Sequence, residues 1–170
     1  MIVLLVFVIG ILYYFTDIFQ SPPKDDRKAV NVKKDMNSDT IKVLGISSEG
    51  ADLQLHKSNN NHIQATLSGK IPKRDNVQVK IESLGTELYV DVSYKEGITN
   101  QEEKEIQPFP AKLKLDVFLP SKQYEAISLH SGDGKIASDL SLQASEIKVD
   151  TQAGDVNLDH LKGDQIHFNS

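Results

Sequence analysis

A short pattern repeats three times at the C-terminal end of the chain. Residues 127–136 read ISLHSGDGKI, residues 147–156 read IKVDTQAGDV, and residues 166–170 read IHFNS. Each copy alternates apolar and polar residues up to a Ser or Thr, and the two complete copies continue through a glycine turn to another apolar residue. A unit of about 20 residues is too small to bury its own apolar face, so such units stack on their neighbours. The repeat therefore predicts a β-solenoid, or β-helix.

The alternation gives each position of the repeat a role. Apolar residues at alternate positions point inward and stack from one rung to the next. Ser131 and Thr151 fall at the next inward position, near the corner, where a hydroxyl can bond turn backbone. Gly134 and Gly154 supply the freedom of a corner, which predicts positive φ at both. The predicted rung core consists of Ile127, Leu129, Ile136, Ile147, Val149, Val156, Ile166 and Phe168.

The period of two also dominates the chain before the repeats. Runs rich in Val, Ile and Leu alternate with polar residues and are bounded by Gly, Asn, Pro or Ser, which is typical of strands with one buried face. Residues 41–170 are therefore expected to form one all-β domain of roughly 20-residue rungs. The runs before the repeats span residues 51–55, 63–67, 77–81, 88–94 and 113–119.

The N-terminus gives the second strong signal. Residues 1–15 read MIVLLVFVIGILYYF, without a charge. A membrane crossing needs about 20 apolar residues, with a lower limit near 17. A signal peptide would have a basic start and a small-residue cleavage site, and neither is present. We expect an uncleaved transmembrane helix over residues 1–19, followed by a linker over residues 20–40, which shows neither a helical nor a strand period.

Composition excludes several kinds of function. The chain has 19 basic and 24 acidic residues, a net charge of −5, with no clustered basic surface, which argues against nucleic-acid binding. Cysteine is absent, so the chain has no disulfide, thiolate metal site or cysteine nucleophile. The five histidines are scattered without metal-ligand spacing. We expect no metal and no cofactor.

Acidic and aromatic residues are weighed as carriers of chemistry. A polysaccharide-active β-helix needs carboxylates gathered on one face. Alignment of the first two copies instead places Asp133 beside Ala153 and Lys135 beside Asp155, so no catalytic residue is predicted. With aromatic residues at 6% and no tryptophan, a sugar-stacking platform is not favoured either. Its candidates would be Tyr89, Tyr94, Phe109 and Tyr124.

Ser170 aligns with Ser131 and Thr151, so the sequence stops in mid-rung. A solenoid that stops there exposes a sheet edge. We expect the domain to be incomplete at its C-terminal end, with further rungs beyond Ser170.

The anchor, the β-rich section that ends at residues 117–120 (VFLP) and the repeats after it resemble the LiaG-like putative-adhesin domain family. The resemblance covers roughly residues 41–170. It implies a β-helical domain displayed outside a bacterial membrane, often encoded beside cell-envelope stress-response systems, with no established enzymatic activity. The basic residues that follow the span, among them Lys24 and Arg27, favour the opposite orientation by the positive-inside rule.

Three functions stay open at this point. The first is a non-enzymatic, membrane-anchored module that contacts an envelope component or a partner protein. The second is a polysaccharide-active enzyme. The third is a structural solenoid that polymerises end to end.

Overall fold

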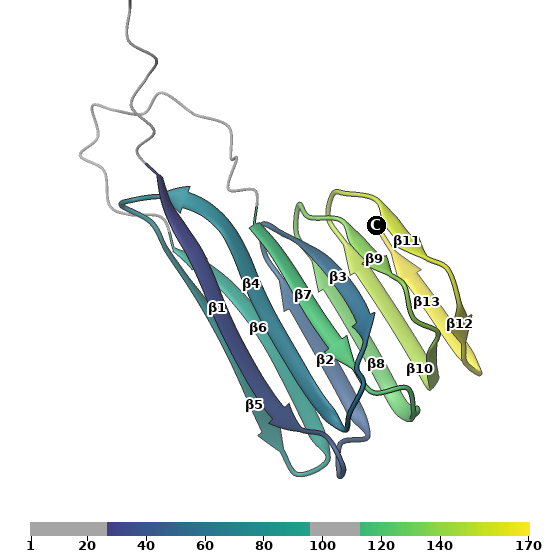
Figure 1. The fold of residues 1–170 in the computed structure, drawn as a ribbon. Coiled ribbons are helices and arrows are strands. Elements are labelled where there is room, and N and C mark those ends of the chain that lie inside the picture. Colours follow the sequence, from purple (N-terminus) through teal and green to yellow (C-terminus); the bar gives the residue numbers. More distant parts are fainter. Residues whose placement is uncertain (1–26, 96–112) are drawn as a thin grey trace, which may run out of the picture.

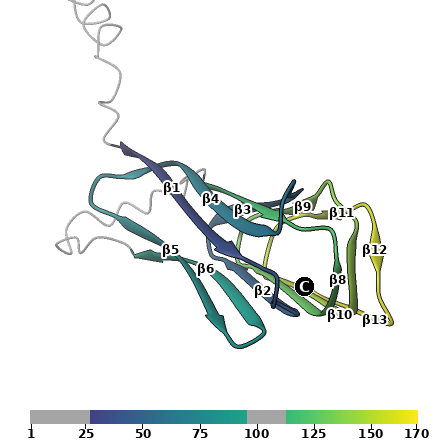
Figure 2. The ribbon, with the colours of Figure 1, turned by 60° about the horizontal axis from the view of Figure 1, so that its bottom comes forward.

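The computed structural model describes residues 27–95 and 113–170, and these residues form two mixed β-sheets that face each other (Figures 1 and 2). The prediction of an all-β domain is confirmed. Sheet A is ordered β1 (Arg27–Asn37), β4 (His62–Pro72), β7 (Leu113–Leu119), β3 (Ala51–Lys57), β9 (Ile136–Ser138) and β11 (Val156–Leu158). Sheet B is ordered β5 (Asn76–Leu84), β6 (Glu87–Lys95), β2 (Val43–Ser48), β8 (Gln123–Ser131), β10 (Leu142–Thr151) and β12 (Leu161–Lys162), and β13 (Gln165–Asn169) also pairs with β10.

The predicted anchor at residues 1–19 lies outside the described residues. Across residues 27–95 and 113–170, the structure contains no helix able to span a membrane.

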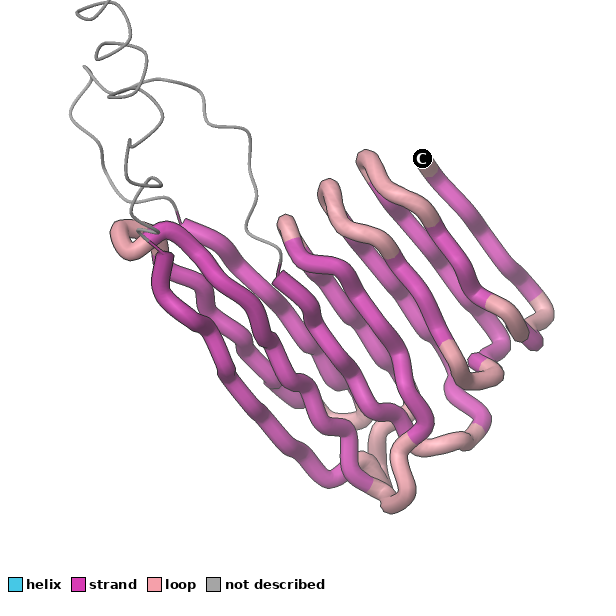
Figure 3. Tube along the Cα trace, turned by 45° about the horizontal axis from the view of Figure 1, so that its top comes forward, coloured by secondary structure: helices cyan, strands magenta, loops and turns pink. Residues whose placement is uncertain are grey.

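The parallel part of the two sheets is built from rungs, each consisting of a sheet B strand and the sheet A strand that follows it in the chain. Three rungs, β2–β3, β8–β9 and β10–β11, lie side by side in that order, and their strands pair in parallel. The pair β6–β7 lies on the other side of β2–β3, again in parallel. Loops gather where the chain passes between the sheets (Figure 3).

The order of the rungs in space differs from their order in the chain. The β2–β3 rung comes first in sequence but lies between β6–β7 and β8–β9. The chain reaches this arrangement by crossing to the far end of both sheets through β4 and β5 and returning through β6 and β7. The pairs β1–β4, β4–β7 and β5–β6 are antiparallel. The domain is therefore not built from 20-residue rungs throughout. Antiparallel neighbours can be joined by short turns, whereas parallel ones need a crossover.

Strand β1 corrects the expected linker. Residues 27–37 lie within the region expected to lack regular structure, but they pair antiparallel with β4 along their whole length. Val30, Val32 and Met36 pack against the core from one face of β1, while its other face is charged and polar. Lysines and aspartate between these apolar residues obscured a period of two that an edge strand needs on one face only.

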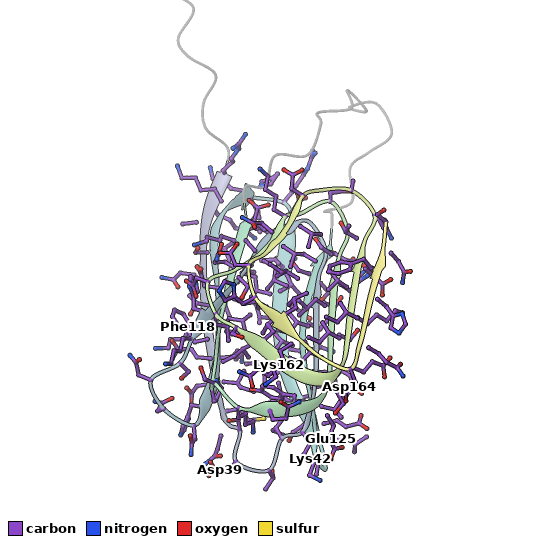
Figure 4. The ribbon with its side chains drawn as sticks, turned by 90° about the vertical axis from the view of Figure 1, so that its right-hand side faces the viewer. Asp39, Lys42, Phe118, Glu125, Lys162 and Asp164 are labelled. Atoms are coloured by element: carbon purple, nitrogen blue, oxygen red, sulfur yellow. The ribbon has the colours of Figure 1, made fainter. Side chains whose placement is uncertain are left out.

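The core lies between the sheets and is almost wholly aliphatic. Inward positions alternate with exposed or half-buried positions along the rung strands, as in residues 43–48 and 113–119. Figure 4 looks along the stack and shows this filled interior. Burial of such side chains is the main force that holds two sheets together. The largest fully buried residues are Leu44, Ile46, Leu53, Leu55, Ile63, Leu67, Ile71, Leu88, Leu115, Leu119, Ile127 and Leu129.

Candidate functional site

The corner between the sheets is built in the same way in two neighbouring rungs. Ser131, at the end of β8, donates its hydroxyl to the carbonyl oxygen of Gly134 at 2.8 Å. Ser48, at the end of β2, makes the equivalent bond to the carbonyl oxygen of Ala51 at 2.8 Å. Both serines are fully buried, so each satisfies its own hydroxyl and a turn carbonyl inside the domain.

Thr151 holds the same position in the next rung, opposite Ser131. Its hydroxyl donates to the carbonyl oxygen of Ala153 at 3.1 Å, and its side chain is half-buried. Backbone bonds also join the corners, since the amide of Gln152 donates to the carbonyl oxygen of Ser131. The hydrogen bond of the corner hydroxyl is therefore longer and more exposed at Thr151 than at Ser48 and Ser131.

The corners at positions 134 and 154 require glycine for different reasons. Gly154 has a φ of +119°, as the sequence predicts. Gly134 does not have a positive φ, and that expectation is wrong. A Cβ at Gly134 would lie 2.1 Å from the carbonyl oxygen of Ala51, so the close approach of the neighbouring rung requires glycine there.

The predicted core positions lie in register from rung to rung. The first row contains Ile127, Ile147 and Ile166, the second contains Leu129, Val149 and Phe168, and the third contains Ile136 and Val156. The residues of these rows on β8, β9 and β10 are buried, and Val156 on β11 is half-buried.

Ile166 and Phe168 depart from the expected burial. They are 39% and 57% exposed, although they continue the inward rows. Their strand β13 pairs with β10 on one side and has no further described strand on the other. Burial at an inward position needs a covering rung on both sides, and β13 has one.

A polar cluster gathers on the outer face of sheet A around His56 of β3. Its Nδ1 lies 2.6 Å from Asp139 Oδ2, and its Nε2 lies 2.8 Å from Asp116 Oδ1. Lys114 Nζ lies 2.8 Å from the same Asp116 oxygen. The imidazole ring stacks on Phe118, with ring centroids 4.9 Å apart. Figure 4 labels Phe118 at the side of the domain, outside the packed interior. The cluster joins β7, β3 and the turn after β9.

The charges in this cluster support one another. Burial acts to lower the pKa of His56, but hydrogen bonds to Asp116 and Asp139 outweigh it and raise the pKa above its ordinary value of 6.5. Burial acts to raise the pKa of Asp116, but hydrogen bonds from Lys114 and His56 hold it below 3.8. With a carboxylate on each ring nitrogen, His56 has no free nitrogen to accept a substrate proton. This arrangement suits a charged clamp between strands better than a general base.

Asp150 and Asp155, near the corners, are both engaged by neighbouring side chains. Lys135 Nζ lies 3.4 Å from Asp155 Oδ2, in agreement with the alignment of these two positions between the repeats. Asp150, on the outer face of β10, accepts a bond from Asn169 at 2.6 Å and pairs with Lys148 at 3.0 Å. The Asn169 bond contributes most to holding the pKa of Asp150 below its ordinary value. Within the described residues, no group of three or more His, Asp or Glu residues is arranged to hold a metal ion.

The outer face of sheet B carries an exposed aromatic residue. Tyr89 of β6 is 46% exposed and lies opposite Gly45 of β2. Its hydroxyl donates to Glu87 Oε2 at 2.5 Å, and the Glu87 carboxylate raises the pKa of Tyr89 above its ordinary value of 10.0. Of the other aromatic candidates, Tyr124 is buried, and the Tyr94 side chain and Phe109 are outside the described residues.

Comparison with known proteins decides the family. The model of the family named Toastrack DUF4097 matches residues 41–170, which is most of the chain. The chain belongs to the DUF4097 toastrack family. The match begins after β1, which forms the edge of sheet A beside β4.

Solved structures resemble this chain at low sequence identity, and one of them shares its fold. A putative cell adhesion protein from Clostridium sporogenes is 16% identical with a TM-score of 0.54, over 77% of this chain and 61% of that one. A putative adhesin from Parabacteroides merdae is 10% identical with a TM-score of 0.39, over 84% and 60%. This chain therefore spans about three fifths of the length of these proteins. No curated protein matches it significantly.

The sequence pattern alone did not predict two parts of this toastrack domain. The β2–β3 rung carries the repeat pattern, since Leu44, Ile46 and Ser48 lie opposite Ile127, Leu129 and Ser131. Alignment of residues 44–53 with residues 127–136 would have found it. The His56 cluster has no comparable signal, because its partners come from strands whose neighbours depend on the crossing topology.

Proposed function

We propose that the protein is a non-enzymatic, membrane-anchored module of the bacterial cell envelope. Residues 1–19 hold it in the membrane, and the toastrack domain lies outside, where it acts by surface contact with an envelope component or a partner protein. The resemblance to LiaG-like proteins supports a place in an envelope stress response.

One observation carries this proposal. Outward side chains of successive strands lie in register, so each outer face of the domain presents straight rows of side chains. On sheet B, one row contains Tyr89 on β6, Ser128 on β8 and Lys148 on β10. Gly45 of β2 lies in the same row but contributes no side chain. Asp91, Ser47, His130 and Asp150 form the next. Side chains spaced by the strand separation of about 4.8 Å suit an extended, repetitive partner.

The fold comparison adds support. The solved structure from Clostridium sporogenes, with which this chain shares its fold, is described as that of a putative cell adhesion protein. An adhesive role needs a broad, stable surface and no reacting groups. The rows on a rigid pair of sheets provide such a surface.

The enzyme alternative has less support from the geometry. Asp155 pairs with Lys135, and both ring nitrogens of His56 are engaged by carboxylates. A glycan hydrolase needs two carboxyl groups placed on either side of the scissile bond. Exchange of both Asp133 and Asp155 for asparagine should leave the binding of envelope material unchanged.

Sedimentation with isolated bacterial cell walls tests the proposal. The full chain, held in detergent micelles, should sediment with cell walls in a saturable manner and release no soluble sugar fragments. A parallel sample without cell walls detects self-association. Failure to bind cell walls above the level of empty micelles, or release of glycan fragments, would contradict the proposal.

A further inference from the structure

The ring of Tyr89 leans toward Gly45 on the outer face of sheet B, where it forms an exposed aromatic plate. A Cβ added at Gly45 would lie 2.7 Å from Tyr89 Cδ1 and 3.0 Å from Tyr89 Cε1. The tyrosine ring therefore occupies the space that any other side chain at position 45 would need. The Cδ1–Cε1 edge of the ring leans over the backbone of the neighbouring strand, since Tyr89 Cγ is 3.8 Å from the same position.

Glycine at position 45 destabilises strand β2, and the contact with Tyr89 explains why it is present. Glycine inside a strand loses more conformational freedom than other residues and has no side chain to pack, and it often marks a close approach by another group. Here the group is the ring of Tyr89, and the bond from its hydroxyl to Glu87 Oε2 fixes the far end of the ring. With one side against Gly45, the tyrosine still keeps 46% of its surface exposed to solvent.

Polar groups surround the plate at the spacing of neighbouring strands. Ser128 of β8 lies opposite Gly45, one strand beyond the ring. Asp91 and Ser47 lie two residues further along β6 and β2, opposite each other and on the same face. No hydrogen bond within the described part of the chain engages the side chains of these three residues. Their oxygens are thus available to an incoming ligand.

This combination matches the chemistry of a sugar. The apolar C–H face of a pyranose ring stacks on a flat aromatic ring, while its hydroxyl groups bond to acceptors and donors around the rim. The carboxylates of Glu82, Glu87 and Asp91 are close to the plate, since Glu82 lies opposite Tyr89. They repel polyanions and accept hydrogen bonds from hydroxyl groups.

We propose that Tyr89, whose ring fills the space beside Gly45, is the stacking subsite for an uncharged polysaccharide strand of the cell wall. This inference rests on the proposed function and names the face and the ligand class for it. Ser47, Ser128 and Asp91 are the hydrogen-bonding positions around the subsite. A tyrosine here was not favoured from the sequence, because one aromatic residue in an aromatic-poor chain shows nothing of the glycine beneath it.

A purely structural role for Tyr89 is the competing explanation. An aromatic residue across from a strand glycine can restore packing that the glycine lacks. Under that explanation Tyr89→Leu changes stability only. Under the glycan proposal Tyr89→Leu also weakens binding, because a branched aliphatic side chain offers no flat face, whereas Tyr89→Phe retains most of it.

The test is a titration of the full chain, in detergent micelles, with chitohexaose, an uncharged oligomer of N-acetylglucosamine. Amide signals of Gly45, Ser47 and Ser128 in the NMR spectrum should shift during the titration. Tyr89→Ala and Gly45→Ala should each weaken binding about tenfold, as expected for loss of one aromatic contact. The matched control is Leu84→Ala, which removes another exposed apolar residue of sheet B and should change nothing. A hyaluronate oligomer of similar length, which carries a carboxylate on alternate sugars, should bind at least about tenfold more weakly.

The outcomes separate this inference from the proposed function. If the full chain sediments with cell walls but chitohexaose shifts none of the three signals, or Tyr89→Ala binds as tightly as the wild type, the subsite is wrong and the proposed function stands. If the wild type binds neither cell walls nor chitohexaose, both are wrong. Should Tyr89→Ala unfold, the signals of the wild type decide alone.

Discussion

Ser48 and Ser131 occupy the same corner of neighbouring rungs, although strands β3 to β7 separate them in the chain. Each donates its hydroxyl to the carbonyl oxygen three residues later, at 2.8 Å in both cases. A corner that returns in the same form after such a long excursion shows that the rung, and not the order of strands in the chain, is the unit of this fold.

Removal of the corner hydroxyl should destabilise the domain in a graded way. Ser131→Ala leaves the carbonyl oxygen of Gly134 without its buried partner, which costs about 1 to 3 kcal/mol. Thr151→Ala should cost less, because Thr151 is half-buried and water can replace its bond. Urea denaturation of the two variants measures the difference. Equal losses would show that the corner bond does not depend on burial.

Gly134→Ala should be among the most damaging small substitutions. The added Cβ would meet the backbone carbonyl oxygen of Ala51 at 2.1 Å, and a backbone carbonyl cannot move aside without disturbing the next rung. We expect a loss of about 3 kcal/mol in the free energy of unfolding. The matched control is Gly132→Ala in the same corner, where the nearest atom would be 3.9 Å away. A tolerated Gly134→Ala would mean that adjacent rungs lie further apart than the structure shows.

Much of the repeat could be predicted from the sequence, because the local period of two determines which of its positions are apolar and face inward. Ile127 and Ile147 lie opposite each other as the spacing implies, and Lys135 pairs with Asp155 as the alignment implies. The φ of Gly134 could not be predicted in this way. The distance between two rungs decides whether a glycine is needed for its φ or for its size, and one rung alone does not contain that distance.

The polar faces were harder to predict, because their partners are remote in the chain. His56 meets Asp116 and Asp139 only because β7 and β9 flank β3 on opposite sides. Tyr89 meets Gly45 only because β6 lies beside β2. Local patterns predict which side of a strand faces the core, but they do not predict which strands become neighbours.

His56 should stabilise the domain in a pH-dependent way. Its pKa in the folded state lies above 6.5, so its contribution is complete below about pH 6.5 and disappears as the pH rises through the folded value. Asp116, with a pKa below 3.8, contributes above that value and loses its contribution at more acidic pH. His56→Gln should therefore cost about 1 to 3 kcal/mol near pH 5.5 and less near pH 8.5. Thermal unfolding of both proteins at the two pH values measures this, and a cost that does not change with pH would contradict the clamp.

Tyr89 should lose its hydroxyl proton at a higher pH than an ordinary exposed tyrosine. The Glu87 carboxylate accepts its hydroxyl proton and disfavours the phenolate, so the pKa of Tyr89 exceeds 10.0. Glu87→Gln should lower it toward the ordinary value. Ultraviolet absorbance of the phenolate follows the titration, with Tyr89→Phe used to identify the signal. No change in Glu87→Gln would mean that the hydroxyl does not bond to this carboxylate.

The central claim is that the toastrack domain acts outside the membrane, and one labelling measurement tests it directly. The chain contains no cysteine, so Gln152→Cys places a single thiol on an exposed corner. Intact bacteria that express this full chain are treated with a maleimide that does not cross membranes, and a second sample is treated after lysis. The account predicts equal labelling in the two samples. Labelling that occurs only after lysis would place the domain inside the cell and contradict the account.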